Sequence, residues 1–132
     1  MQVMKKYINI KNSMRILFLI YIMCNIYNAE IAKSTYRHDV DYQVSRFQEY
    51  NVKPIQINKK DRLGGYYSVY LYYGDISDKE LDSVILDLHN DGFIEYSNKH
   101  NKKFHKNNVS VVFVHNNDKS IEILVSVYEG KE

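Results

Sequence analysis

The sequence predicts an α+β domain: an antiparallel sheet of four to five strands, covered on one face by a main helix, with a shorter N-terminal helix. Three observations carry this prediction. Residues 78–91 repeat apolar side chains at helical spacing, residues 66–73 alternate as a strand does, and two apolar stretches near the C-terminus flank a short polar turn. Runs of strands and helices in this arrangement are typical of α+β folds.

The first 29 residues have the pattern of a secretory signal peptide or an N-terminal membrane anchor. The apolar stretch "ILFLIYIMCNIY" at residues 16–27 follows four basic residues, Lys5, Lys6, Lys11 and Arg15, and no acidic residue precedes it. A basic region followed by about 12 apolar residues is typical of an export signal. We therefore expect residues 33–132 to form a single domain that is exported to the periplasm.

Two features of this segment leave alternatives open. Tyr27 and Glu30 stand where cleavage after Ala29 or Ala32 would favour a small residue, so the cleavage point is not defined and an uncleaved segment would anchor the domain. A translation start at Met23 would delete most of the apolar stretch and leave a cytoplasmic form.

Cys24 is the only cysteine, so the chain has no internal disulfide. The preceding residues "YIM" lack the small residue expected before a lipid-modified cysteine. We therefore interpret Cys24 as part of the apolar stretch.

A helix is predicted over residues 40–50, where Val40, Val44 and Phe47 recur at helical spacing and Asp39 is a candidate N-cap. The next segments, "PIQIN" and the tyrosine-rich run, are separated by turn residues and predict a hairpin of residues 54–58 with residues 66–73.

The clearest helix signal is "GDISDKELDSVILDLHNDGF". Ser77 and Glu80 form a capping box, and Gly92 can adopt the left-handed conformation that ends a helix. Apolar residues fall on one face, namely Leu81, Val84, Ile85 and Leu88. This pattern predicts a helix over residues 78–91.

The C-terminal third predicts a short strand, a basic polar loop and a final hairpin. The corresponding segments are "FIEYS", "NKHNKKFHKNN", and "VSVVFVH" with "SIEILVSVY" joined by "NNDK". The hairpin has apolar residues on both faces, so we expect one of its faces to meet the N-terminal helix or a partner.

The stretch "GGYYSVYLYYGD" at residues 64–75 contains five tyrosines. Alternate side chains of a strand point to opposite faces, and the set with both aliphatic residues belongs to the core: Tyr67, Val69, Leu71 and Tyr73. The other face receives Tyr66, Tyr70 and Tyr72. Tyrosine combines large contact area with few rotatable bonds, so this row is a candidate partner-binding site, or else an ordinary strand surface.

Acidic residues gather on the predicted exposed side of helix 78–91. They include Asp78, Asp82 and Asp87. This side is either a solvated helix face or an acidic ridge that enters a basic cleft on another protein.

We expect no nucleic-acid partner. Removing residues 1–29 leaves 14 of the 18 basic residues against all 16 acidic ones, so the domain is slightly acidic. Phosphate binding depends on clustered Lys and Arg, and base stacking pairs aromatic with basic residues, of which residues 65–74 contain none.

No catalytic, cofactor or metal motif is present. The chain lacks Gly-x-Ser-x-Gly, and "LGGYY" leads into a strand instead of a helix N-terminus. His38, Asp39 and Asp41 are conceivable metal ligands, but their spacing favours solvated residues. His100 and His105 belong to the predicted basic loop. We therefore expect a protein that is not an enzyme and needs no cofactor or metal.

In its general build the chain resembles the small exported immunity proteins that bacteria keep against toxins delivered to the cell envelope, for instance by type VI secretion. The resemblance is carried by "KKYINIKNSMRILFLIYIM", by a single domain rich in residues with AT-rich codons, and by an aromatic strand beside "SDKELDSVILDLHND". It implies a one-to-one complex that blocks a toxin, with the tyrosines as anchors and the aspartates facing a basic patch.

Two other classes remain as competing expectations. One is an envelope structural or adhesion-type protein, and the other is a small ligand carrier or enzyme without a recognisable motif, for which His100 and His105 would have to converge with carboxylates in a pocket.

Overall fold

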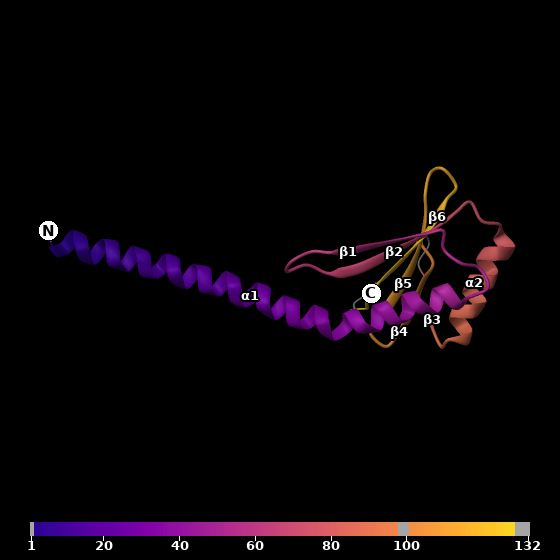
Figure 1. The fold of residues 1–132 in the computed structure, drawn as a ribbon, viewed down its shortest axis with the longest axis horizontal. Coiled ribbons are helices and arrows are strands. Elements are labelled where there is room, and N and C mark those ends of the chain that lie inside the picture. Colours follow the sequence, from indigo (N-terminus) through magenta and orange to yellow (C-terminus); the bar gives the residue numbers. More distant parts are fainter. Residues whose placement is uncertain (1, 98–100, 129–132) are drawn as a thin grey trace.

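The computed structural model describes residues 2–97 and 101–128, and it confirms the α+β class. Six strands form one antiparallel sheet in the order β1-β2-β6-β5-β4-β3 (Figure 1). In chain order the elements are α1 (Gln2–Glu49), β1 (Gln56–Asp61), β2 (Tyr67–Gly74), α2 (Asp78–Asn90), β3 (Ile94–Glu95), β4 (Lys103–Lys106), β5 (Val109–His115) and β6 (Ile121–Val127). The sheet thus has more strands than the four to five predicted, and the additional strand is β4.

Helix α1 runs without interruption through two segments that were predicted separately. It spans 48 residues, so residues 40–50 contribute its C-terminal end instead of forming a separate helix. The first proline or glycine of the chain is Pro54, and nothing before it breaks the helical hydrogen-bond pattern. The prediction of a shorter N-terminal helix is therefore wrong, and Asp39 lies inside α1 instead of capping it.

The C-terminal part of α1 covers one face of the sheet. Val40, Val44 and Phe47 are buried at the predicted helical spacing, and α1 contacts β2, β5 and β6. Helix α2 lies at one end of the sheet, where Val84 and Leu88 join the core (Figure 1). The prediction that residues 78–91 cover the sheet is therefore wrong, because the short connection from β2 makes α2 begin where β2 ends.

Helix α2 itself confirms the predicted capping box. The Ser77 hydroxyl accepts a hydrogen bond from the Glu80 backbone N–H at 3.2 Å, and the Glu80 carboxylate accepts one from the Ser77 N–H at 3.4 Å. Gly92 follows the C-cap Asp91 with φ +94°, a conformation that glycine adopts without strain. The predicted bounds of this helix agree with the structure to within one residue.

Replacing Ser77 by alanine is expected to lower the free energy of unfolding by about 1 kcal/mol, because the Glu80 N–H loses its acceptor. Urea denaturation followed by circular dichroism would measure the change. Ser45→Ala, an exposed serine inside α1, is the matched control and should cost nothing, since alanine is the better helix former. Equal losses in both variants would contradict the cap.

The predicted basic loop contains strand β4, so that prediction is wrong for residues 103–106. Phe104 is fully buried and pairs with Val111, while Lys103 and His105 point to the other face. A tight turn at Asn107, with φ +53°, joins β4 to β5. One apolar residue among lysines and histidines shows no alternation, which explains why the pattern did not predict a strand.

The two faces of the sheet follow the predicted alternation. Tyr67, Val69, Leu71 and Tyr73 are all at most 1% exposed and face α1. The final hairpin forms as predicted, and its α1-facing side chains complete the core: Val109, Val111, Phe113, Ile123 and Val125. The other apolar side chains of this hairpin lie on the opposite face of the sheet.

Candidate protein-binding face

The open face, meaning the sheet face opposite α1, consists of the side chains that alternate with the core residues. Strand register places three of them side by side on β2, β6 and β5, namely Tyr70, Leu124 and Val112. The next row is Tyr72, Glu122 and Val114. All six are half-buried, so this face offers aromatic and aliphatic surface to a partner.

Tyr66 and Tyr70 come together at a shallow hollow of about 340 Å³ on the open face. Its other walls are Ser68 of β2 and three residues of β6, namely Leu124, Ser126 and Val127. Tyr66 lies just before β2 and is 65% exposed. Tyr72 lies further along β2 on the same face, outside the hollow. The structure thus brings two of the three predicted tyrosines into one site.

A second aromatic group, absent from the sequence prediction, adjoins this hollow. The rings of His105 and Tyr128 stack at 4.2 Å with an angle of 11° between their planes, and Tyr96 meets both edge-on. The Tyr96 hydroxyl shares a hydrogen bond with Ser110 at 2.7 Å, and Ser110 pairs with Ser126 at the hollow. His105 belongs to β4, and Tyr96 and Tyr128 directly follow β3 and β6, so only strand pairing reveals the group.

A lysine contacts the tyrosine row from the neighbouring strand. The Lys60 ammonium of β1 lies 4.6 Å from the centre of the Tyr70 ring. Residues 65–74 contain no basic residue, but strand pairing brings Lys60 of β1 over the Tyr70 ring, so the tyrosine row does have a basic neighbour. The expectation of no nucleic-acid partner therefore depends on the acidic balance of the domain alone.

The predicted aspartates occupy a different part of the molecule. Asp78 and Asp82 are exposed on α2, and Asp87 is half-buried with its carboxylate 3.4 Å from the Asn51 backbone N–H. Tyr66 precedes the first residue of β2 whereas α2 follows the last, and eight strand residues extend about 26 Å. The aspartates therefore form a patch separate from the hollow.

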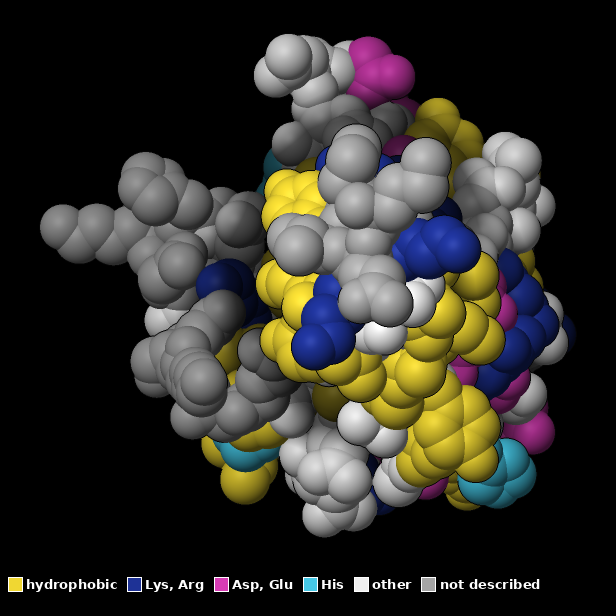
Figure 2. Space-filling view, turned by 90° about the vertical axis from the view of Figure 1, so that its left-hand side faces the viewer, with side chains coloured by type: hydrophobic (Ala, Val, Ile, Leu, Met, Phe, Trp, Pro, Cys, Tyr) yellow, Lys and Arg dark blue, Asp and Glu magenta, His cyan; other side chains and the backbone are white. Residues whose placement is uncertain are grey.

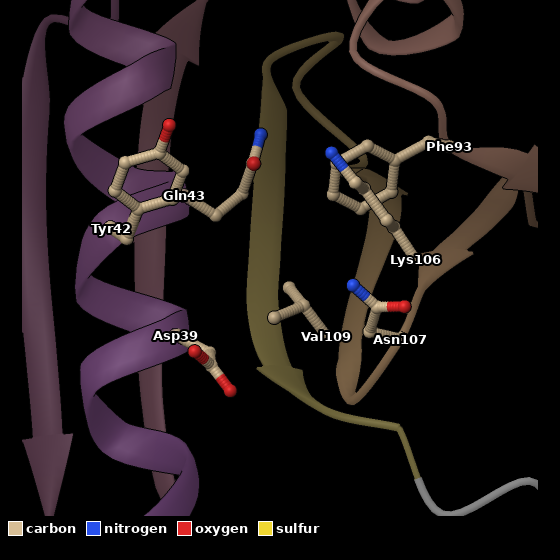
Figure 3. Close-up of a pocket in the computed structure, with 7 residues that line it drawn as sticks. All are labelled: Asp39, Tyr42, Gln43, Phe93, Lys106, Asn107 and Val109. Carbon is tan, nitrogen blue, oxygen red and sulfur yellow. The ribbon is translucent and has the colours of Figure 1, made fainter.

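A smaller cavity of about 230 Å³ lies between α1 and the β4–β5 turn (Figure 3). Its walls combine polar and apolar side chains: Asp39, Tyr42, Gln43, Phe93, Lys106, Asn107 and Val109. Two of the polar groups are already engaged, because the Gln43 amide donates to the Tyr50 hydroxyl at 3.1 Å and the Lys106 ammonium donates to the Asp91 carbonyl at 2.6 Å. The first bond lies at the C-terminal end of α1, and the second joins β4 to the residue that ends α2.

Beside this cavity, Asp91 anchors a network that joins α1 to the end of α2. Its carboxylate accepts from the Arg46 guanidinium at 2.9 and 3.3 Å and from the Tyr50 hydroxyl. The hydrogen bonds from Arg46 lower the pKa of Asp91, with Tyr50 adding to the effect. Burial, followed by the bond to Asp91, raises the pKa of Tyr50. The network joins the C-terminal part of α1 to the end of α2 and so stabilises the fold.

The conceivable metal ligands lie on α1. Asp41 accepts a hydrogen bond from the Tyr67 hydroxyl, and burial of that hydroxyl, followed by the bond, raises its pKa to about 12. Among the described residues, no three His, Cys, Asp or Glu side chains are grouped so as to hold a metal ion. His105 belongs to the aromatic group, and His100 lies outside the described residues.

A scan of the chain against protein-family models found no match, and searches of curated proteins and of solved structures found no significant similarity.

Proposed function

We propose that this chain is a protein-binding inhibitor, an immunity protein that neutralises a secreted bacterial toxin in the cell envelope through a one-to-one complex. Its binding surface is the open face, with Tyr66 and Tyr70 as anchors. The observation that supports this proposal best is the hollow between them on a sheet face opposite the covering helix. Tyrosines beside a hollow are typical of the energetic centre of protein interfaces.

The N-terminal segment supports the periplasm as the place of action. Its apolar part follows Lys5, Lys6, Lys11 and Arg15, and such basic residues remain on the cytoplasmic side while the following domain is translocated. A form that starts at Met23 would keep the sheet-packing end of α1 and stay in the cytoplasm.

The aspartates of α2 extend the proposal to a second contact. Asp78, Asp82 and Asp87 would face a basic patch of the toxin, and opposite charges of this kind mainly speed association. Because this patch is separate from the hollow, its contribution to affinity is independent of the tyrosines.

The competing classes differ in what they would bind. A structural or adhesion-type protein would self-associate through the open face, without a toxin. A ligand carrier would use the cavity beside α1, but its volume of about 230 Å³ lies below the roughly 300–1,000 Å³ of ordinary ligand sites.

Replacing Tyr70 and Tyr72 together by serine is expected to weaken the complex by at least about 2 kcal/mol, or about 30-fold in Kd, because the partner loses the anchor Tyr70 and the neighbouring ring of Tyr72 on the open face. The toxin would first be captured from envelopes of the native cells with the full chain. A captured protein is accepted as the toxin only if it is toxic in the envelope by itself and harmless when this chain is present. Calorimetry would then give the affinity.

Tyr42→Ser is the matched control, because Tyr42 is a 63% exposed tyrosine of α1, away from the open face. It should leave Kd unchanged. If the double variant remains folded and binds the toxin as tightly as the control does, the open face is not the binding surface. Self-association of the chain with no toxin would favour the structural class.

A further inference from the structure

Residues 16–23 of α1 are apolar on all sides of the helix and make little contact with the domain. Eight consecutive side chains are exposed, from 37% at Ile22 to 67% at Met23, and the other six are Ile16, Leu17, Phe18, Leu19, Ile20 and Tyr21. Successive helical residues point about 100° apart, so this surface has no polar side. Viewed from the side of the N-terminus, Figure 2 shows apolar side chains gathered behind the projecting lysines. A helix of this kind requires lipid or an apolar environment around it.

About two helical turns after Met23, Glu30 and Lys33 of α1 contact the end of β1 and the loop between β1 and β2. Lys33 is only 3% exposed, and its ammonium contacts Asp61 at 2.6 Å, Glu30 at 2.8 Å and the Arg62 carbonyl at 2.7 Å. Glu30 also accepts a hydrogen bond from the Gly64 N–H at 2.8 Å. Cleavage after Ala32 would remove Glu30, so the Gly64 N–H would lose its acceptor and Lys33 would keep only Asp61 and the Arg62 carbonyl. These contacts oppose cleavage after Ala32 and hold the helix that carries the apolar residues against the β1–β2 turn.

The same contacts place the β1–β2 turn (residues 62–66) beside the end of the apolar segment. A side-chain carbon at Gly64 would lie 3.7 Å from Ile26, and a hollow between turn and helix is lined by Ala29 and Tyr66. Figure 1 shows the β1–β2 hairpin running back along α1 toward the N-terminus. At its tip Leu63 is 79% exposed. An exposed leucine thus lies at the level where the apolar helix ends.

Length explains why this tip would approach a bilayer. Residues 16–27 extend about 18 Å at 1.5 Å per residue, whereas the hydrocarbon core of a bilayer is about 30 Å thick. A short span draws its flanking residues toward the lipid. On one side Lys11 and Arg15 can extend their charged ends to the headgroups. On the other side of the bilayer, the residues nearest the lipid include Leu63 at the tip of the β1–β2 hairpin.

We infer that α1 is retained as a single membrane span and that the β1–β2 turn rests in the headgroup layer on the domain's side of the bilayer, with Leu63 inserted among the lipids. The basic residues before the span lie on the cytoplasmic side, and the domain lies on the opposite side. The lipid surface is then a second binding partner next to the open face, with Tyr66 at the border between the two, whatever protein that face binds.

The absence of tryptophan from the chain makes a direct test available. Leu63→Trp introduces a single tryptophan at the tip of the full chain, which is reconstituted in vesicles of phosphatidylethanolamine and phosphatidylglycerol and excited at a wavelength that the 13 tyrosines do not absorb. Ile55→Trp is the matched control, since Ile55 is 73% exposed next to the other end of β1. Tyr66→Trp gives a second reading at the tip.

The tip tryptophans should emit at shorter wavelength than the control and should lose most of their emission when the lipids carry bromine on their acyl chains. The Ile55→Trp emission should stay almost unchanged. Equal quenching at all three positions would overturn the insertion of the tip. Mass spectrometry of the chain from native membranes should show residues 16–27 present, and a mature protein that begins after them would overturn the inference altogether.

Discussion

Replacing Phe104 by alanine is expected to lower the free energy of unfolding by about 3–5 kcal/mol, the range for removing a fully buried phenylalanine. The side chain packs against Phe113 at 5.6 Å between ring centres and against His89 at the same distance. Small domains have about 5–15 kcal/mol of stability in total, so this single change removes a large share of it. Urea denaturation of the full chain in detergent would measure the loss.

The result also tests strand β4. Leu86→Ala is the matched control, because Leu86 is a 59% exposed apolar residue of α2 and its replacement should change the stability by less than about 0.5 kcal/mol. If Phe104→Ala were as mild as the control, residues 103–106 would be the solvated loop that their composition suggests.

Replacing Asp91 by asparagine is expected to cost about 2–4 kcal/mol of stability. The amide keeps the shape of the side chain and one acceptor oxygen, but it loses the negative charge that pairs with Arg46. Its NH2 group also replaces one of the two oxygens that accept from Arg46 and from the buried Tyr50. The Asp91 side chain is 19% exposed, so its ion pair with Arg46 is intermediate between a surface pair and a fully buried pair. The expected loss of stability lies between the values for those two cases. The loss would be measured by urea denaturation at pH 7.

The difference in stability between the parent chain and Asp91→Asn should depend on pH. The hydrogen bonds from Arg46 hold the pKa of Asp91 below its usual range in the folded state, so the unfolded chain takes up the proton first as the pH falls. The stabilisation is complete above the unfolded value of about 4 and is lost as the pH falls through the lower, folded value. The difference between the parent chain and Asp91→Asn should therefore be constant above about pH 5 and shrink below about pH 4.

Asp82→Asn controls for the general effect of removing a carboxylate, because Asp82 is exposed on α2. Its stability difference from the parent should be small at every pH. A gap for Asp91→Asn that stays constant down to pH 2 would show that the network with Arg46 and Tyr50 does not depend on the charge.

Local patterns predicted the parts of the fold that local interactions determine. The capping box at Ser77 and the stop at Gly92 define α2 through contacts within a few residues. The alternation in β2 correctly assigned Tyr67 and its companions to the core, since a strand with one buried face has only one consistent register.

The parts that were missed depend on residues distant in sequence. Strand β4 has one buried residue, Phe104, and exists because β5 offers it a partner. The covering role of α1 depends on how the chain returns to the sheet, which no periodicity reveals. The apolar N-terminal stretch and the helix over residues 40–50 were predicted as separate elements. They belong to one helix, because no residue between them ends it.

The candidate site likewise contains residues that a local sequence pattern predicted and contacts that it did not predict. Tyr66, Tyr70 and Tyr72 were predicted because they share one strand, and the structure places them on one face. The contact of Lys60 with Tyr70 and the stacking of His105 on Tyr128 arise between strands, so a single stretch of sequence contains no signal for them.

The unbroken course of α1 also limits where the domain can act. The part of the helix after Tyr27 extends about 33 Å at 1.5 Å per residue, and it packs along the sheet instead of leading into a flexible linker. With α1 held in the bilayer, the open face would remain within about that height above the lipid and could not turn freely. A toxin that binds the open face as proposed would then have to come close to the membrane.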